Sequence, residues 1–397
     1  MDDIIWNKLV LLRYILVLEG KIKYEPYDIS GGMNQMNTFA MIGSRDGSPL
    51  LQEFAAGLQR EMESNGYQLD EEVPPEIQLV LNFVDAASPR HFRRSGKGTF
   101  VVTVAEGKPH TDSILHTAYP VLIRSLGNLM IYLSIGNGEP ETYFLTLEQG
   151  CYSVKESFGT EGYFREVFER LQPLATSQLV IDNHFFPDLP ETLWEGDGIT
   201  RDIHRSGKKL DEMNLLPAPF PIQELLPPKD YRHIQRLYGI GGLSYGNLSA
   251  RREENQFWMS ARGVNKGNLH QIGRDILLIK GFDDSTPAME ISVPPHIEPK
   301  RASVDAIEHW MIYTEHPEVG AIIHIHAWMD GVTSTEINYP CGTVQLAEAV
   351  ADQIRKAEDP SRAVVGLKNH GLTITGRDLD DIFERIDGRI LPQVPMS

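Results

Sequence analysis

Three histidines near the C-terminal end carry the clearest chemical signal in this sequence. His324 and His326 lie in the run GAIIHIHAW, whose β-branched residues predict a buried strand. Side chains two residues apart on a strand point to the same face, about 7 Å apart along the chain, so both imidazoles can reach one metal ion. His370 ends a second apolar run, VVGLKNHG, where Gly371 would allow a sharp turn. Three imidazoles leave one coordination position open, as catalytic metal sites do.

A simpler interpretation competes with the metal site. A single histidine in an apolar stretch is more often a core residue with satisfied hydrogen bonds than a ligand. Two buried histidines without a metal would be costly, because each needs hydrogen-bond partners. A solvated strand is disfavoured by Ile322, Ile323 and Trp328 beside them. With His370 added we expect a divalent metal: Zn²⁺ is the first candidate, and Mn²⁺, Co²⁺ or Fe²⁺ would also fit.

The composition is that of a soluble globular protein with room for two domains, at 397 residues, 41% hydrophobic and 23% charged. The net charge of -18 argues against nucleic acid and against an anionic membrane, but not against a small anionic substrate. Two cysteines, Cys151 and Cys341, are too few for a disulfide framework, and no signal peptide is visible, which predicts a cytoplasmic protein. Charges interrupt the apolar run in the first 20 residues, which predicts an amphipathic helix rather than a membrane span.

The chain divides into three parts by pattern, and the fold class we predict is α/β with two domains. Residues 1–183 form an α/β domain of unknown role, residues 184–223 a proline-rich ordered connector, and residues 224–397 a metal-binding domain. In the first domain we predict strands at 39–43, 77–85, 98–106, 128–136, 141–147 and 178–182, and helices at 48–66, 113–127 and 161–174. Its basic stretch at 88–99 is interpreted as a solvated loop, with anion binding as the minority alternative.

Two turns in the second domain carry groups that could hold an anion. The first, GIGGLSYGNLSAR, has glycines 239, 241, 242 and 246, which permit close backbone approach to a ligand. In the second, FWMSARG, the Arg262 guanidinium suits a carboxylate or a phosphate, or is an ordinary surface arginine. The substrate-binding candidates in the two turns are Gly246, Asn247, Ser249, Ser260, Arg262 and Gly263.

A helix precedes the histidine strand directly. Ser303 is the predicted N-cap of a helix that runs to about Glu315, with Asp305 in its first turn. A carboxylate at that position is favourable beside the helix dipole and needs no function. Because the helix leads into the strand of His324 and His326, its N-terminal end could lie near the metal, which makes Asp305 a catalytic candidate.

The motifs GNLS, SARG, SVD, HIH and NHG, in this order, resemble the class II aldolase/adducin family over roughly residues 224–397. Its members include a fuculose-phosphate aldolase and a ribulose-phosphate 4-epimerase. The resemblance implies an α/β/α sandwich around a central, mostly antiparallel sheet. It implies that the three histidines bind the metal. Asn247, the turn around Arg262 and Gly263, and Ser303 would hold a substrate phosphate. Asp305 would be the acidic residue beside the metal, as a base or as a ligand.

Two departures from the family pattern bear on the substrate. Val304 stands where the family has a second phosphate-binding serine, and Arg262 stands where a small hydroxyl residue is usual. This exchange favours a different anion, such as a carboxylate on the substrate. The family also uses an acid for the far side of the substrate, often near a neighbouring subunit. Glu336 and Tyr339, in the segment after the histidine strand, are the candidates here.

The chemistry expected from this ligand set is metal-dependent carbon–carbon cleavage of an aldolase type. The substrate would be a hydroxylated keto compound, a sugar phosphate or a sugar acid, which reacts through a metal-stabilised enediolate. Epimerase, dehydratase and decarboxylase reactions share that intermediate and stay open as alternatives. A non-catalytic interaction module, as in the adducin branch, is a further alternative, whose signature would be loss of the metal ligands. The resemblance also implies a homo-oligomer, a tetramer with sites at subunit interfaces.

Overall fold

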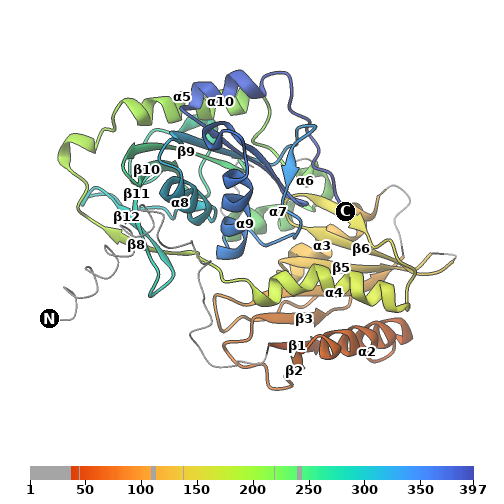
Figure 1. Cartoon of the computed structure of the whole chain (residues 1–397). Helices are drawn as coiled ribbons and strands as arrows, with labels where there is room; N and C mark the ends of the chain where they lie inside the picture. The colour runs from red at the N-terminus through yellow and green to blue at the C-terminus, as the bar shows by residue number, and fades with distance from the viewer. Residues whose placement is uncertain (1–36, 44, 109–112, 137, 219, 239–243) are drawn as a thin grey trace, which may run out of the picture. The chain divides into compact units, whose positions relative to one another are not determined.

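The computed structural model describes residues 37–397, apart from residues 44, 109–112, 137, 219 and 239–243. The helix expected in the first 20 residues, and the glycines 239, 241 and 242, lie outside the described residues. From Thr38 onward the chain builds two β-sheets, each with helices on both faces (Figure 1). The predicted α/β fold with two sheet domains is therefore confirmed.

The first sheet has seven strands in the order β2-β1-β3-β4-β5-β6-β7. The strands β2, β1, β3, β4 and β5 run parallel, and β6 and β7 add an antiparallel hairpin at one edge. Strands β3 and β5 are buried along their whole length, which explains their continuous apolar sequences. The bounds are β1 Thr38–Gly43, β2 Gln68–Leu69, β3 Leu79–Phe83, β4 Phe100–Gly107, β5 Leu129–Ser134, β6 Glu141–Thr146 and β7 Gly150–Ser153.

Three helices cover the first sheet, close to their predicted positions. Helices α2 (Pro49–Ser64) and α4 (Glu161–Thr176) pack with one face of the sheet in a common apolar core, and α3 (Ile114–Ser125) packs on the other. Helix α2 begins after Ser48, whose hydroxyl accepts a hydrogen bond from the Leu51 amide. In the basic stretch, Arg94 donates to the carbonyl oxygens of Thr99 and Leu126, so this part of the loop is tied to the domain.

The segment between the sheets differs from the sequence prediction in two places. The strand predicted at 178–182 is wrong: the strand here is β8 (Asp182–Phe186), which pairs with β12 (Ala288–Ser292) in the second sheet. The proposed boundary between residues 183 and 184 therefore falls inside a strand. The connector also contains α5 (Gly198–Glu212), which forms because no proline lies between residues 191 and 216 and Asp197 caps its start.

The second sheet has nine strands in the order β14-β15-β16-β13-β9-β10-β11-β12-β8. All neighbours are antiparallel except the two edge pairs, β14 with β15 and β12 with β8, so the expected mostly antiparallel sheet is confirmed. Its remaining strands are β9 Asn247–Glu253, β10 Gln256–Ser260, β11 Ile276–Asp283, β13 Ala321–Ile325, β14 Thr333–Ser334, β15 Val364–Leu367 and β16 Gly371–Gly376.

Helices cover both faces of the second sheet. Helices α5 and α10 (Leu379–Ile386) contact each other and the central strands, while α8 (Ala306–Glu315) and α9 (Val344–Arg355) pack together elsewhere on the sheet. Short 3-10 turns occur at Glu191–Leu193, Lys266–Asn268 and Pro360–Arg362. Among the helices that the structure describes, none combines the length and the apolar character needed to cross a bilayer.

One apolar cluster joins segments from both sheet domains. Helices α6 (Ile222–Leu225) and α7 (Pro228–Tyr238) pack against α3 of the first domain. Tyr119 of α3 and Leu145 of β6 share this buried cluster with Ile234 of α7 and with Tyr245, which precedes β9. We call it the junction cluster. It fixes the β6–β7 hairpin beside the start of β9. The three histidines lie near the start of β9.

Candidate metal centre

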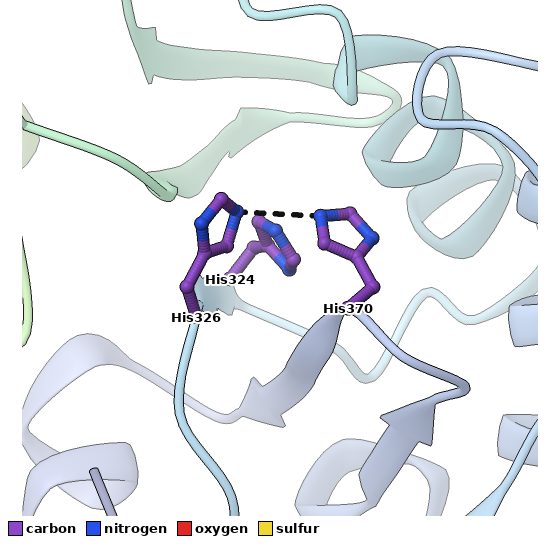
Figure 2. A group of neighbouring side chains, drawn as sticks. All are labelled: His324, His326 and His370. Atoms are coloured by element: carbon purple, nitrogen blue, oxygen red, sulfur yellow. Dashed lines mark hydrogen bonds between the residues drawn. The ribbon is translucent and has the colours of Figure 1, made fainter. Parts of the chain in front are cut away.

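The sheet brings the three histidines together. His324 lies in β13 and His326 directly follows that strand, while His370 directly precedes β16. Strands β13 and β16 pair antiparallel, with His324 opposite Thr373, so His370 faces the end of β13. Each imidazole offers a nitrogen within 4.8 Å of the others, and the rings point toward a common centre (Figure 2). The predicted triad is therefore assembled in the structure.

Two close backbone contacts shape the turn that carries His370. The left-handed residue is Asn369, with φ 55, rather than Gly371 as the sequence suggested. Asparagine tolerates this conformation better than most residues. Gly371 is needed for another reason: a Cβ atom there would lie 2.2 Å from the carbonyl oxygen of Ile325. The glycine thus permits β16 to approach β13, which sets the distance between His370 and the other histidines.

The three imidazoles are neutral, the form that binds metals. Each ring is buried, and burial lowers the pKa of His324 and His326 and lowers that of His370 to about 3. The histidines also lower the pKa of one another, because two positive charges at this distance repel. Protonation therefore does not compete with a cation near neutral pH.

The hydrogen bonds of the triad fit a bound cation. His324 Nδ1 lies 3.0 Å from the carbonyl oxygen of Leu372, which can only accept, so Nδ1 carries the proton and Nε2 keeps a lone pair. That buried Nε2 has no hydrogen-bond partner among the described residues. The Nε2 atoms of His326 and His370 lie 3.3 Å apart (Figure 2). A divalent ion between the rings would satisfy these nitrogens, and a carbonyl that orients a ligating histidine is common at metal sites.

Asp305 lies beside the triad and does not cap the helix that follows it. The predicted N-cap, Ser303, is wrong: α8 starts at Ala306, Asp305 occupies the N-cap position, and its side chain makes no capping hydrogen bond. Its Oδ2 atom instead accepts from Asn247 Nδ2 at 2.7 Å and from Ser303 Oγ at 3.3 Å. The buried Oδ1 atom has no hydrogen-bond partner in the part of the chain that the structure describes. Because this carboxylate does not cap the helix, it is available to act in proton transfer or to bind a cation.

The electrostatics keep Asp305 ionised. Burial raises the pKa of its carboxyl, but the adjacent imidazoles of His324 and His370 and the hydrogen bond from Asn247 lower it by more, so the net pKa is below its usual value. Glu308, one turn along α8, is affected in the opposite sense: burial and then the charge of Asp305 raise its pKa to about 8. One of the two neighbouring carboxyls is thus a carboxylate and the other an acid.

A cavity of about 140 Å³ opens beside these groups. Asp305, His326 and His370 line it, together with two cationic side chains, Arg262 and Lys266. Three further residues predicted from the sequence line it as well: Gly246, Gly263 and Ser303. At Gly246, with φ 68, a Cβ atom would lie 2.4 Å from the carbonyl oxygen of His324, so this position requires glycine. The cavity combines metal ligands, a carboxylate and cations, as a site for a small anionic molecule requires.

Other predicted residues lie outside the residues that line the cavity. Ser249 is fully buried and its hydroxyl bonds His309 Nδ1 and Tyr313 Oη, so it belongs to a polar network in the core. Ser260 Oγ accepts from the Leu248 amide. Glu336 is exposed and Tyr339 is half-buried against the apolar core. Direct roles of these residues in binding or catalysis stay predictions.

The structure adds residues that were not among the predicted site residues. Lys266 is 4% exposed, and its ammonium group donates to the carbonyl oxygen of Ser244 at 2.7 Å. Burial lowers its pKa to about 8, although Asp305 and Glu148 oppose the shift. The Cys341 thiol lies 3.3 Å from His370 Nε2. Lys266 follows the SARG turn in the sequence, and only its burial distinguishes it from a surface lysine.

Glu148 was missed entirely, because it comes from the first domain. It lies between β6 and β7 and lines the same cavity, with its Oε2 atom 3.9 Å from His326 Nε2. Its side chain is 41% exposed because it faces the cavity. Burial, and then the charge of Asp305, raise the pKa of Glu148 to about 7, against the opposing effect of Arg262 and Lys266.

Sequence comparison finds one family match, and it lies in the C-terminal half. Residues 231–336 match the family described as the class II aldolase and adducin N-terminal domain. Over these residues the C-terminal half is similar to this domain. The match includes Asn247, Arg262, Asp305, His324 and His326. A comparison with curated proteins gave no match.

Several solved structures are similar to the class II aldolase/adducin domain. An L-fuculose 1-phosphate aldolase shares 20% identity with a TM-score of 0.33, over 48% of this chain and 81% of its own. The L-fuculose-1-phosphate aldolase of Thermus thermophilus shares 16% identity with a TM-score of 0.30, over 47% and 86%. The N-terminal class II aldolase domain of a conserved protein from Thermoplasma acidophilum shares 16% identity with a TM-score of 0.31, over 51% and 94%.

Proposed function

We propose that this protein is a divalent-metal-dependent carbon–carbon lyase that acts on a small hydroxylated keto compound with an anionic group. The observation that carries the proposal is the triad His324, His326 and His370. Its three neutral imidazoles face one centre at the wall of a cavity that also holds a free carboxylate oxygen of Asp305. A divalent ion bound there supplies Lewis-acid stabilisation of the negative charge that develops on the substrate oxygens.

Asp305 is the proposed general base. Its Oδ2 atom is held by Asn247, which leaves Oδ1 directed away from that hydrogen bond. As a carboxylate it takes the proton from the substrate hydroxyl whose oxygen becomes the carbonyl oxygen of the released aldehyde. The electron pair of the broken carbon–carbon bond stays on the carbon beside the keto group. Acid–base assistance of this kind contributes about 10²- to 10⁴-fold in rate.

Arg262 and Lys266 hold the anionic end of the substrate. Both line the cavity, and Lys266 is fixed by its hydrogen bond to Ser244. Guanidinium presents parallel donors that suit a carboxylate or a phosphate, whereas ammonium contributes a point charge. Val304 also lines the cavity, so an apolar side chain lies where the family has a second serine. This pairing favours a sugar acid over a sugar phosphate.

The experiment that tests the proposed function is a cleavage screen with metal control. Purified protein is incubated with a panel of hydroxylated keto acids and ketose phosphates, and the products are identified by NMR. We expect release of an aldehyde, loss of this activity after chelation, and recovery with Zn²⁺, Mn²⁺, Co²⁺ or Fe²⁺. The double variant His324→Ala/His326→Ala is the matched control and should be inactive with every ion.

The same screen separates the alternatives. Epimerase, dehydratase and decarboxylase reactions give products of different mass or configuration from the same substrates, so the NMR spectra identify them. A protein that binds a metal but transforms no member of the panel would point to the non-catalytic interaction module. Activity that survives complete removal of the metal would contradict the proposed function.

A further inference from the structure

We propose that the first domain completes the active site of the second: Glu148, in the β6–β7 turn, is a catalytic acid of the lyase reaction. This inference rests on the proposed function. It assigns a chemical role to the first domain, and it places the second proton-transfer group of the reaction in this domain rather than at Glu336 or Tyr339.

The position of Glu148 is the first argument. Its carboxyl oxygen lies 3.9 Å from His326 Nε2, although the two residues belong to different sheets. It lines the cavity together with Asp305, Arg262 and Lys266. A molecule that reaches the triad and contacts Asp305 in this cavity therefore also meets Glu148. The cavity thus offers two carboxyl groups, one from each domain.

The turn that carries Glu148 is held in place. The Gln149 amide donates to Thr146 Oγ1 at 3.0 Å, and the Tyr119 hydroxyl donates to the Leu147 carbonyl oxygen at 2.8 Å. Gly150, with φ 104, closes the turn in a conformation that favours glycine. Both neighbours of Glu148 are therefore fixed by hydrogen bonds, which is how a catalytic group is kept in position.

The junction cluster ties this turn to the metal centre. Tyr245 belongs to that buried cluster together with Tyr119, and its ring stacks on the His326 ring, with centroids 5.5 Å apart and planes at 26°. The Tyr245 hydroxyl is buried and has no hydrogen-bond partner among the residues that the structure describes. Tyr245 lines the cavity, so a polar ligand bound there would satisfy its hydroxyl.

The reaction needs a second proton transfer, which Glu148 supplies. Asp305 takes the hydroxyl proton as the carbon–carbon bond breaks, and the electron pair remains on the carbon beside the keto group. Glu148, as the carboxylic acid, donates its proton to that carbon and the keto product forms. The aldehyde and the keto product leave, and the proton on Asp305 returns to Glu148 through water. Atoms and charge balance without any further reactant.

The test uses Glu148→Gln in the full chain, with Glu139→Gln as the matched control. Glu139 is an exposed residue in the same domain that does not line the cavity, so the same glutamate-to-glutamine exchange is made away from the site. Two quantities are measured. Metal content per chain is determined by mass spectrometry. Proton exchange at carbon is followed by NMR in D₂O, with dihydroxyacetone phosphate and pyruvate as the keto probes.

We expect Glu148→Gln to bind as much metal as wild type but to exchange the carbon-bound protons about 10²- to 10⁴-fold more slowly. Glu139→Gln should match wild type in both measurements. Exchange in Glu148→Gln at the wild-type rate would overturn the role of Glu148 and leave the lyase proposal intact. Loss of metal from Glu148→Gln would overturn the acid role in favour of a ligand. If wild type exchanges neither probe, the lyase proposal fails in wild type itself, and the role of Glu148 fails with it.

Discussion

The two sheet domains bury their polar groups in different ways. In the first, two pairs of buried hydroxyls bond each other, Thr103 with Ser125 and Thr142 with Tyr163, each at 2.7 Å, while the buried hydroxyls of Tyr67 and Thr117 have no partner among the described residues. In the second, buried carboxyl and imidazole groups are left without all of their hydrogen bonds. Across the described residues, every buried carboxylate or imidazole atom without a hydrogen-bond partner belongs to the second domain, including those of Asp305 and His324.

This difference indicates that the two domains have different roles. Unsatisfied buried polar atoms cost stability, so a fold retains them where a ligand satisfies them. We infer that the first domain is a scaffold that contributes one acid, Glu148, on a turn at the cavity, and that the second domain holds the metal ligands and the base. Four substitutions test this difference between the two domains.

The largest effect is expected at Asp305. Asp305→Asn keeps the shape and can keep the Asn247 contact, but it removes the base, so we expect kcat to fall about 10²- to 10⁴-fold. Steady-state kinetics on the substrate that the screen identifies measure this effect. Asp330→Asn, at an exposed position, is the control. An unchanged kcat would show that Asp305 is not the base.

A core truncation in the first domain should affect stability and not chemistry. Leu81 is fully buried in β3, so Leu81→Ala should lower the free energy of unfolding by about 2–5 kcal/mol. Denaturant titration measures the loss, and Ile135→Ala, at 40% exposure, should cost far less. The metal content and kcat of the folded Leu81→Ala protein should equal those of wild type. A selective loss of metal would contradict the scaffold role.

Glu308 should make the metal-free protein less stable at high pH. Its pKa of about 8 in the folded chain lies above the unfolded value of 4.5, so the folded state binds more protons between these values. The contribution of Glu308 to the free energy of unfolding is therefore fully present below about pH 4.5. It is lost as pH rises toward 8, by up to a few kcal/mol.

Glu308→Gln should remove this fall, because a neutral side chain retains the contact with Thr373 without titrating. Urea midpoints at acidic and alkaline pH measure the difference, with the exposed Glu358→Gln as the control. Equal pH dependence in wild type and Glu308→Gln would show that the buried carboxyl does not titrate as described.

The smallest effect is expected at Lys266. Lys266→Met removes one charge from the anion end of the cavity and should raise KM about tenfold or somewhat more, since a charge-assisted hydrogen bond contributes about 1.5–3 kcal/mol. Metal content should stay unchanged. The control is Lys208→Met on an exposed helix surface, where side-chain exposure is 65%. An unaltered KM would show that the anionic group of the substrate does not bind at Lys266.

How much of this site the sequence predicted depends on how far apart in the chain the interacting residues lie. His324 and His326 are two residues apart on one strand, so local periodicity was enough to pair them, and the sheet confirms the pairing with His370. Most strands and all three helices of the first domain also followed from local pattern, but the short strands β2 and β7 were not predicted. The strand expected at 178–182 failed, because β8 pairs with β12, and that partner lies more than 100 residues away.

Glu148 could not be predicted, because nothing in its own segment is unusual. The glutamate sits in a hairpin turn, where a solvated carboxylate is the ordinary interpretation. Its place at the cavity depends on the packing of α3 and α7 in the junction cluster, and long-range packing leaves no local pattern. For Asp305 the nearby motif was visible, but its failure to cap α8 appeared only in the structure.

Metal content of the purified protein is the most direct test of the central claim, that the three histidines form a divalent-metal site. It is measured by mass spectrometry on wild type and on His324→Ala/His326→Ala, each after reconstitution with Zn²⁺, Mn²⁺, Co²⁺ or Fe²⁺. The account predicts about one ion per chain in wild type and almost none in the variant. Wild type that binds no ion under any of these conditions would contradict it.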